Sequence, residues 1–240
     1  MPIYYAKLTK EGESPKFDQI VAPNVETAKI NLKTINKDWR ITGLGEFLCE
    51  AKLWFFLNMY FFTYNFEIVY DKKIKGNDNI RPDFQIINNQ NNQIILIVEF
   101  DGYQHYTKAQ EVLKDVTKDL IYKGLGYKVI RLPYFIQIRK EIVDHFFCQG
   151  FPYDNSYLHG FIDPKVTLPS DFCELGMMKF LKDMKRFNII NPTIPADIVK
   201  SLKCKITTLE FNNKTIIPKN VIGRTVLSKK YQNKFKIYGW

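Results

Sequence analysis

Apolar and polar residues in the middle of the chain are spaced as in one helix followed by three strands. From Gly45 onward, the segment EFLCEAKLWFFLNMYF repeats apolar residues at helical spacing. Three segments rich in Ile, Val, Phe and Tyr follow, a composition typical of strands: NFEIVYDKKI, IRPDFQII and IILIVEFDG. Because the polar NNQNNQ joins the second segment to the third, we expect these two strands to form a hairpin.

The alternation of helix and strand continues after this hairpin. KAQEVLKDVTKDLIYKGLG predicts an amphipathic helix that ends at Gly124 or Gly126. YKVIRLPYF then predicts a strand that stops at Pro133, and IRKEIVDHFF predicts another helix. The resulting order of helix, three strands, helix, strand and helix predicts an α/β fold with a mixed sheet.

Three regions follow from these patterns. Residues 1–40 predict a short β-containing N-terminal extension, and residues 41–151 hold the α/β core. Residues 152–240 form a second, smaller region, in which DFCELGMMKFLKDMKRF and IPADIVKSL predict helices. The rest of that region mixes short strand-like runs with turns.

Composition narrows the class of protein. A hydrophobic content of 45%, with 19 Phe and 14 Tyr, predicts a globular chain. The longest apolar stretches, LWFFLNMYFF and IILIV, are shorter than the roughly 20 residues of a membrane span. The start, MPIYYAKLTKEG, lacks the pattern of a secretion signal, and the four cysteines are scattered without a CxxC pair. We therefore expect reduced thiols, a cytoplasmic or nuclear location and no membrane partner.

The net charge of +10 is concentrated at the C-terminal end. From Lys200 to Trp240 there are ten basic residues and one acid, Glu210. Such a region is typical of proteins that bind nucleic acids, because each phosphate neutralised by Lys or Arg releases a counterion. Aromatic residues alternate with the lysines, which suits stacking contacts as well as phosphate contacts. A C-terminal strand whose aromatic side chains fill a core groove fits the same pattern.

The helix predicted at residues 171–187 adds a second basic surface. It places Lys179, Lys182, Lys185 and Arg186 over one broad side, which fits contact with DNA or an ordinary solvated face. Together, the two regions give the expected DNA contacts, which are Lys182, Arg186, Arg224, Lys229, Lys230, Lys234 and Lys236.

The stretch EFDGYQH, residues 99–105, carries two carboxylates at the end of a predicted buried strand. Because side chains alternate along a strand, Glu99 and Asp101 point to the same face, and Asp83 lies on the neighbouring strand of the hairpin. Three carboxylates there would repel one another unless a cation neutralises them. Oxygen ligands favour Mg²⁺ or Mn²⁺, which can activate a phosphodiester for hydrolysis. Taken alone, Asp101-Gly102 is more simply a turn at the end of a strand.

RPDF, VEFDGYQH and DVTKDLIYKGLGYKVIRL, in this order, resemble the PD-(D/E)XK nuclease superfamily. Within it, they are similar to the branch of very-short-patch repair endonucleases and related small endonuclease domains. The resemblance covers about residues 45–147. It implies a restriction-endonuclease-like αβββαβ core with a mixed sheet. It also implies cleavage of phosphodiester bonds in DNA with Mg²⁺, for which Mn²⁺ can substitute.

The resemblance gives roles to individual residues. Asp83 stands at the family's first metal-binding aspartate and Glu99 at its second acid. Asp101 occupies a position that is lysine in the most common form of the motif and aspartate in the DGxxH branch. His105 falls at the histidine of that branch. The implied metal ligands are Asp83, Glu99 and Asp101.

Two further positions complete the implied site. Asp115 and Lys118 lie near an acid and a basic residue of the branch's downstream helix, so Lys118 is a candidate for a lysine that has moved off the strand. Glu46 resembles the acid of the first helix, and Glu50 is its rival. His105 could act as general acid or base, or orient a phosphate or water. Whether His105 or Lys118 replaces the missing lysine is open.

The sequence therefore predicts a Mg²⁺-dependent DNA endonuclease that is sequence-specific, restriction-like and active on double-stranded DNA. The alternatives are a nicking, repair or homing endonuclease on the same core, and a nuclease that acts on RNA. A catalytically inactive DNA-binding module is a further alternative, favoured by the missing strand lysine. The oligomeric state is open, with a homodimer as one option.

Overall fold

The computed structural model describes residues 1–45, 49–61, 64–77, 79–147, 159–160 and 168–202. The chain divides into two compact units. The first unit contains Met1–Phe100 and Tyr127–Arg139 together with β9 (His159–Gly160). The second unit contains Asp101–Gly126 and the helices that follow Arg139.

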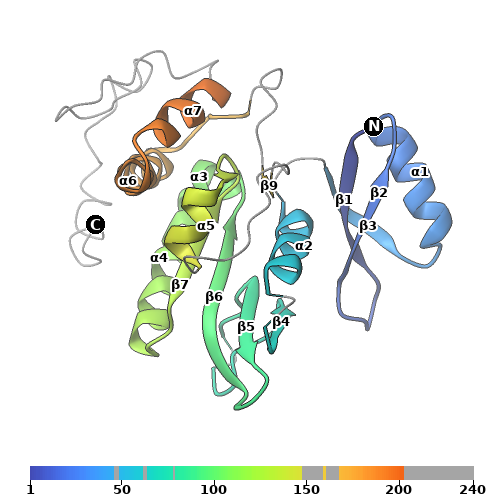
Figure 1. Ribbon diagram of the computed structural model, residues 1–240, viewed down its shortest axis with the longest axis horizontal. Helices are drawn as coiled ribbons and strands as arrows, with labels where there is room; N and C mark the ends of the chain where they lie inside the picture. The colour runs from blue at the N-terminus through green and yellow to red at the C-terminus, as the bar shows by residue number, and fades with distance from the viewer. Residues whose placement is uncertain (46–48, 62–63, 78, 148–158, 161–167, 203–240) are drawn as a thin grey trace. The chain divides into compact units, whose positions relative to one another are not determined.

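The first unit begins with a three-stranded antiparallel sheet covered on one face by a helix (Figure 1). Its elements are β1 (Ile3–Thr9), β2 (Lys16–Val21), α1 (Val25–Ile35) and β3 (Arg40–Gly45), and the strand order is β2-β1-β3. Leu8 of β1 packs against Leu32 of α1, because alternate residues of the strand face the helix. Asn24 caps α1, since its side chain accepts the Thr27 N–H at 2.9 Å. The predicted β-containing extension is thus present, and its last strand runs to Gly45.

The rest of the first unit is built on a mixed four-stranded sheet. Its elements are α2 (Glu50–Phe61), β4 (Phe66–Tyr70), β5 (Phe84–Asn88), β6 (Gln93–Asp101) and β7 (Val129–Pro133), with strand order β4-β5-β6-β7. β5 and β6 are antiparallel, with Phe84 opposite Val98, so the predicted hairpin is confirmed. β7 ends at Pro133 as predicted. A two-residue strand, β8 (Gln137–Ile138), pairs with β9.

The first core helix is present as α2, which begins at Glu50. Gly45 ends β3, where it pairs with Tyr5 of β1, and residues 46–48 lie outside the described residues.

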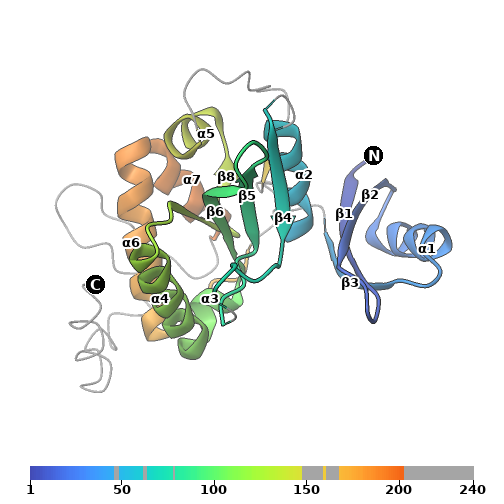
Figure 2. The same ribbon diagram turned by 90° about the horizontal axis from the view of Figure 1, so that it is seen from below.

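In the second unit, the described residues after Asp101 form five helices. They are α3 (Gln104–Thr107), α4 (Ala109–Gly124), α5 (Lys140–Phe146), α6 (Glu174–Ile190) and α7 (Thr193–Ser201). The four longest match helices that the sequence predicts. α4 ends at the predicted glycines, where Gly126 has a φ of +76°, a left-handed conformation that favours glycine. α6 packs against α3 and α4, as Figure 2 shows for α4.

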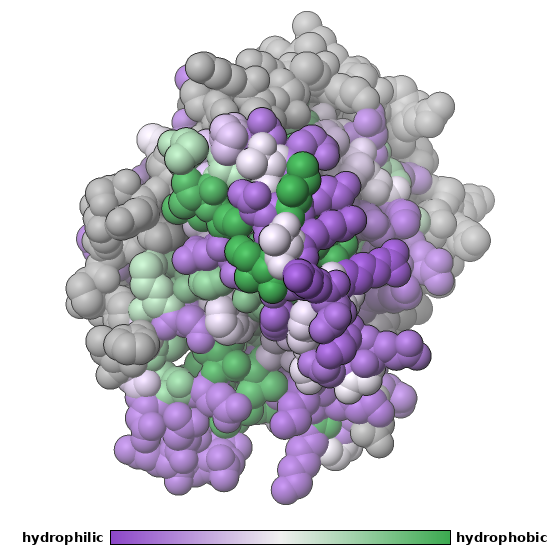
Figure 3. Space-filling model, turned by 90° about the vertical axis from the view of Figure 1, so that its right-hand side faces the viewer, coloured by the Kyte–Doolittle hydropathy of each residue, from purple (hydrophilic) through white to green (hydrophobic). Residues whose placement is uncertain are grey.

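The predicted α/β class with a mixed sheet is confirmed at this level. None of the helices in the described ranges combines the length and apolar character needed to cross a membrane. The face of the molecule in Figure 3 is mostly hydrophilic, with smaller apolar areas between the polar side chains.

Candidate functional site

In the first unit, the β5–β6 hairpin brings Asp83 and Glu99 to neighbouring strands. Phe84 is opposite Val98, so Asp83 and Glu99 are the next positions on the two strands. The Asp83 carboxylate accepts the backbone N–H of Phe100 through Oδ2 at 2.7 Å. Glu99 is only 2% exposed, and a buried carboxylate at a strand end requires polar partners. The structure thus brings together two of the three predicted metal ligands.

A third acid of the first unit, Glu50, is fixed at the start of α2. Lys7 Nζ lies 2.7 Å from Glu50 Oε2, and the Tyr70 hydroxyl donates to the same oxygen. Burial raises the pKa of the Tyr70 phenol, and the nearby charges of Glu50 and Asp83 raise it further. Tyr70 therefore remains a hydrogen-bond donor at neutral pH. The preferred helix acid, Glu46, lies outside the described residues, so Glu50 is the rival whose position is known.

In the second unit, Asp101, Asp115 and Lys179 form a buried ionic cluster. Lys179 Nζ lies 2.8 Å from Asp101 Oδ2 and 2.6 Å from Asp115 Oδ2. The three side chains are at most 5% exposed. Burial of an isolated charge is costly, whereas an ammonium between two carboxylates offsets much of the desolvation of all three groups.

His105 of α3 completes this cluster through one ring nitrogen. Its Nδ1 lies 2.9 and 3.0 Å from the two carboxylate oxygens of Asp115, and 3.8 Å from Asp101 Oδ1. Because a carboxylate accepts, the short contact assigns the hydrogen to Nδ1 and leaves Nε2 as the basic nitrogen of the neutral ring. Within the described ranges, Nε2 has no hydrogen-bond partner. The side chain is 28% exposed, which suits a group that exchanges protons.

A glycine on α6 permits the approach that positions Lys179. A Cβ added to Gly176 would lie 1.6 Å from the carbonyl oxygen of Tyr106, far inside van der Waals contact. The same carbonyl accepts the backbone N–H of Cys173 at 3.0 Å. These two contacts fix the first turn of α6 against α3, and Lys179 follows Gly176 by three residues, one turn along the same side.

The side of α6 that carries Lys179 also carries a second buried acid. The Tyr106 hydroxyl donates to Asp183 Oδ2 at 2.7 Å, and Arg186 Nη2 lies 3.1 Å from Asp183 Oδ1. Burial raises the pKa of Asp183, although Arg186 and the Tyr106 hydrogen bond act in the opposite direction. The Arg186 guanidinium also lies over the rings of Phe146 and Phe187, at 5.3 and 4.6 Å. Arg186 is therefore engaged in internal contacts of the second unit.

One group of residues has the geometry of a metal site. Ligand atoms of Asp101, His105 and Asp115 all lie within 4.8 Å of one another, and no other set of three or more His, Cys, Asp or Glu in the described chain does so. A set of two carboxylates and an imidazole fits Mn²⁺ better than Mg²⁺, which favours oxygen ligands. A divalent ion would have to share both carboxylates with the Lys179 ammonium and displace the hydrogen on Nδ1 of His105.

The predicted metal ligands are therefore divided between two groups. Asp101 lies with His105 and Lys179, whereas Asp83 and Glu99 belong to the first unit. Binding of a metal by Asp83, Glu99 and Asp101 stays a prediction.

The other predicted site residues have varied surroundings. Lys118 is half-buried on α4, three residues after Asp115, and Lys182 is exposed on α6. The prediction that Lys179 shares an outer face with Lys182 is wrong, because Lys179 is 4% exposed. Outside the described residues lie the predicted catalytic acid Glu46 and the predicted DNA contacts Arg224, Lys229, Lys230, Lys234 and Lys236.

Sequence reasoning missed Lys179 as a partner of Asp101, although α6 contains a signal for it. Phe180, Met184 and Phe187 mark the buried side of the helix at helical spacing, and Lys179 and Asp183 are adjacent to that stripe. An acid and a base beside an apolar stripe indicate a buried polar network as much as a solvated edge.

Comparisons of the chain with protein families, curated proteins and solved structures find no significant match. A function for this chain is therefore inferred from the geometry of the described residues.

Proposed function

We propose that the protein is a metal-dependent DNA endonuclease with a restriction-endonuclease-like core, in which His105 takes a proton from the attacking water. The observation that supports this proposal is the contact of His105 Nδ1 with the Asp115 carboxylate at 2.9 Å. A carboxylate that accepts from one ring nitrogen fixes the tautomer and orientation of the imidazole, and the other nitrogen is then available for proton transfer.

Lys179 stabilises the carboxylate that orients His105. Its ammonium lies between Asp101 and Asp115 and offsets part of the repulsion between these two buried acids. Lys179 also places a positive charge beside Asp101, at the strand position where a lysine is common. It is thus a third candidate for that role beside His105 and Lys118.

In this proposal, Asp83 and Glu99 of the first unit hold a divalent ion, Mg²⁺ or Mn²⁺. The chemistry of their donor set fits, because both supply carboxylate oxygens, and Glu99 is buried. Such an ion, when bound, polarises a phosphoryl oxygen and lowers the pKa of a bound water. The basic C-terminal region and Lys182 would hold double-stranded DNA through its phosphates.

Cleavage of supercoiled plasmid in Mg²⁺ or Mn²⁺ tests this function. His105→Gln keeps a donor for Asp115 but removes the base, so we expect cleavage to fall by about 10²–10⁴-fold. Asp83→Asn and Glu99→Gln should abolish cleavage but keep salt-dependent DNA binding. His145→Gln on α5 and Glu11→Gln are matched controls on exposed residues and should cleave normally. Full activity of the His105, Asp83 and Glu99 variants would refute the proposal.

The pattern of products separates the related functions. Discrete bands indicate a sequence-specific enzyme, a single nick indicates a nicking or repair enzyme, and preferred loss of an RNA substrate indicates a ribonuclease.

A catalytically inactive DNA-binding module is the second candidate, and Lys179 is the observation that favours it. Its ammonium already offsets part of the charge of the two carboxylates that would otherwise attract a cation. Calorimetric titration with Mn²⁺ and Mg²⁺ distinguishes the two functions. An endonuclease of the proposed kind binds an ion, and Asp83→Asn weakens that binding. Absence of ion binding and of cleavage, with DNA binding retained, supports the inactive module.

A further inference from the structure

A groove of about 870 Å³ opens on the first unit beside β4. It is lined by residues 12–15 of the β1–β2 loop, residues 67–73, Trp54 of α2 and Arg81. Ligand sites of about 300–1,000 Å³ accommodate molecules of the size of a nucleotide.

Two aromatic side chains line the groove, and a third aromatic ring packs against both of them. Trp54 and Tyr70 both line it, and the Phe17 ring contacts both, with centroid distances of 5.6 and 4.6 Å. Trp54 is half-buried, so part of its indole is accessible. A ring already held in place loses little entropy when a base stacks on it, and stacking accepts any base because every base has a π-face.

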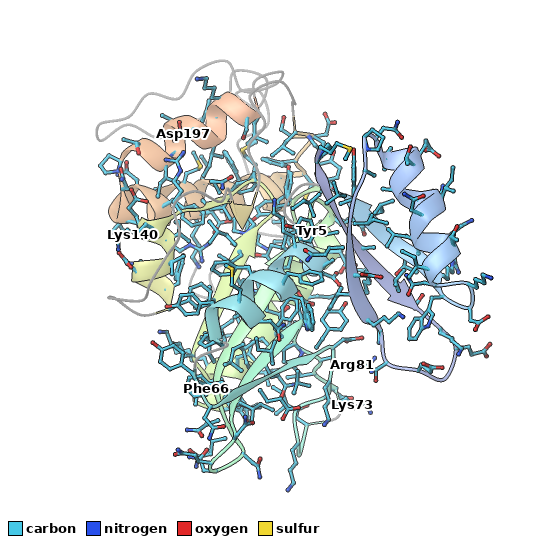
Figure 4. All side chains as sticks on the ribbon, turned by 45° about the vertical axis from the view of Figure 1, so that its right-hand side comes forward. Tyr5, Phe66, Lys73, Arg81, Lys140 and Asp197 are labelled. Atoms are coloured by element: carbon cyan, nitrogen blue, oxygen red, sulfur yellow. The ribbon has the colours of Figure 1, made fainter. Side chains whose placement is uncertain are left out.

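Basic side chains border the same groove. Lys72, Lys73 and Arg81 come from the connection between β4 and β5, and the last two extend from it in Figure 4. Lys72 and Lys73 are exposed, and the side chain of Arg81 is 57% exposed.

Two of the three acids that line the groove have basic partners. Glu13 lies 2.7 Å from Lys10, and Asp71 lies 3.7 Å from Arg81. With Lys10 beside Glu13, four basic side chains stand against three acids at this groove, which favours an anionic ligand.

The connection that carries these basic residues is tied to Asp83. Asp71 has a φ of +45°, a left-handed conformation that is uncommon for a residue other than glycine. Its N–H donates to the Asp83 carbonyl at 2.9 Å, which holds this sharp turn. This turn fixes the direction in which the backbone of Lys72 and Lys73 leaves the sheet. It lies next to Asp83, one of the proposed metal ligands.

We infer that this groove binds an unpaired strand of nucleic acid, with a base stacked on Trp54 and flanking phosphates at Lys72, Lys73 and Arg81. The inference rests on the proposed function for DNA as the natural ligand. It adds that the enzyme holds a locally unpaired segment of its substrate, such as a flipped base or a strand end.

Binding of the full chain to a labelled single-stranded oligonucleotide in EDTA tests this inference without cleavage. Trp54→Ala should weaken binding by about 5–100-fold, the loss expected for one stacked base. Lys72→Ala combined with Lys73→Ala should lower the slope of log affinity against log salt by about 1.4, because each phosphate contact on a single strand contributes about 0.7. The matched control combines Lys29→Ala with Lys33→Ala, two exposed lysines of α1 outside the groove, and should bind like wild type.

An abasic oligonucleotide separates stacking from charge. It keeps the phosphates, so the lysine double variant should lose as much affinity for it as for the normal strand, whereas Trp54→Ala should lose little. Trp54→Phe keeps an aromatic ring against Phe17 and should retain most of the affinity, which guards against misfolding of the alanine variant.

The inference is overturned if the α1 control loses as much affinity as the Lys72/Lys73 variant. It is also overturned if neither Trp54→Ala nor the combined Lys72→Ala and Lys73→Ala variant changes binding. Because these assays contain no metal, they are independent of the cleavage assay. Loss of cleavage in His105→Gln with unchanged strand binding by Trp54→Ala would retain the proposed function and reject the groove. Normal cleavage by His105→Gln, together with weaker strand binding by Trp54→Ala, would retain the groove and reject the proposed function.

Discussion

Substitution of Lys179 by Met is the most direct test of the charged cluster. Met keeps an unbranched side chain of similar length but removes the ammonium from between Asp101 and Asp115, which lie 2.8 and 2.6 Å away. Removal of one partner from a buried ion pair costs about 3–5 kcal/mol, because the remaining charge is left without compensation. Here two carboxylates lose the same partner, so we expect the free energy of unfolding to fall by at least the lower end of this range.

Urea denaturation followed by circular dichroism measures this loss. A loss of about 3–5 kcal/mol is large against a total stability of about 5–15 kcal/mol, so the variant should unfold at a much lower urea concentration. Lys182→Met on the exposed side of the same helix is the matched control and should change stability by less than about 0.5 kcal/mol.

A combined variant isolates the cause of that loss. Addition of Asp101→Asn and Asp115→Asn to Lys179→Met removes the uncompensated charges, and the triple variant should be more stable than Lys179→Met alone. The reasoning is refuted if Lys179→Met costs less than about 1 kcal/mol, or if the two asparagines restore no stability.

Two further predictions concern the contacts that attach α6. Gly176→Ala places a Cβ 1.6 Å from the Tyr106 carbonyl oxygen, so thermal unfolding should show that the free energy of unfolding falls by at least about 1–3 kcal/mol. Gly124→Ala is the control, because no atom lies within 4 Å of the added Cβ, and it should be neutral or stabilising. Unchanged stability of Gly176→Ala would contradict the packing of α6 on α3. Burial raises the pKa of the Asp183 carboxyl above its unfolded value near 3.8, so the folded protein binds a proton more tightly than the unfolded chain. Wild type should therefore lose stability relative to Asp183→Asn as pH rises from about 4 through the folded pKa, and a difference that stays constant between pH 4 and 7 would contradict this.

Local patterns were sufficient to predict most of the elements. The β5–β6 hairpin follows from two apolar segments joined by NNQNNQ, and α4 follows from its amphipathic spacing and its closing glycines. The pairing of β3 with β1 did not, because Gly45 pairs with Tyr5, which lies 40 residues earlier in the chain. Contacts between distant segments decide such pairings, and a local pattern does not contain them.

In the candidate site too, local contacts were predictable from the sequence and contacts between distant segments were not. Asp101 and His105 are four residues apart, and their proximity at the end of a strand was predictable. Lys179 is 64 residues beyond Asp115 and lies on an amphipathic helix, where a lysine beside the apolar stripe fits an exposed or a buried position. The close contact of Gly176 with the Tyr106 backbone decides between these positions, and the sequence shows only that a glycine is present.

The contacts of Lys179 make α6 part of the buried cluster that holds His105. Asp101 ends β6 and Asp115 lies on α4, but the charge that offsets part of their repulsion comes from α6. Without α6, Asp115 would hold its bond to His105 beside a second uncompensated carboxylate, and the pair would repel. The imidazole would then be anchored by a group that itself requires a counter-charge. In the proposed function, His105 therefore depends on α6, a helix of the following region, for the orientation in which it takes a proton.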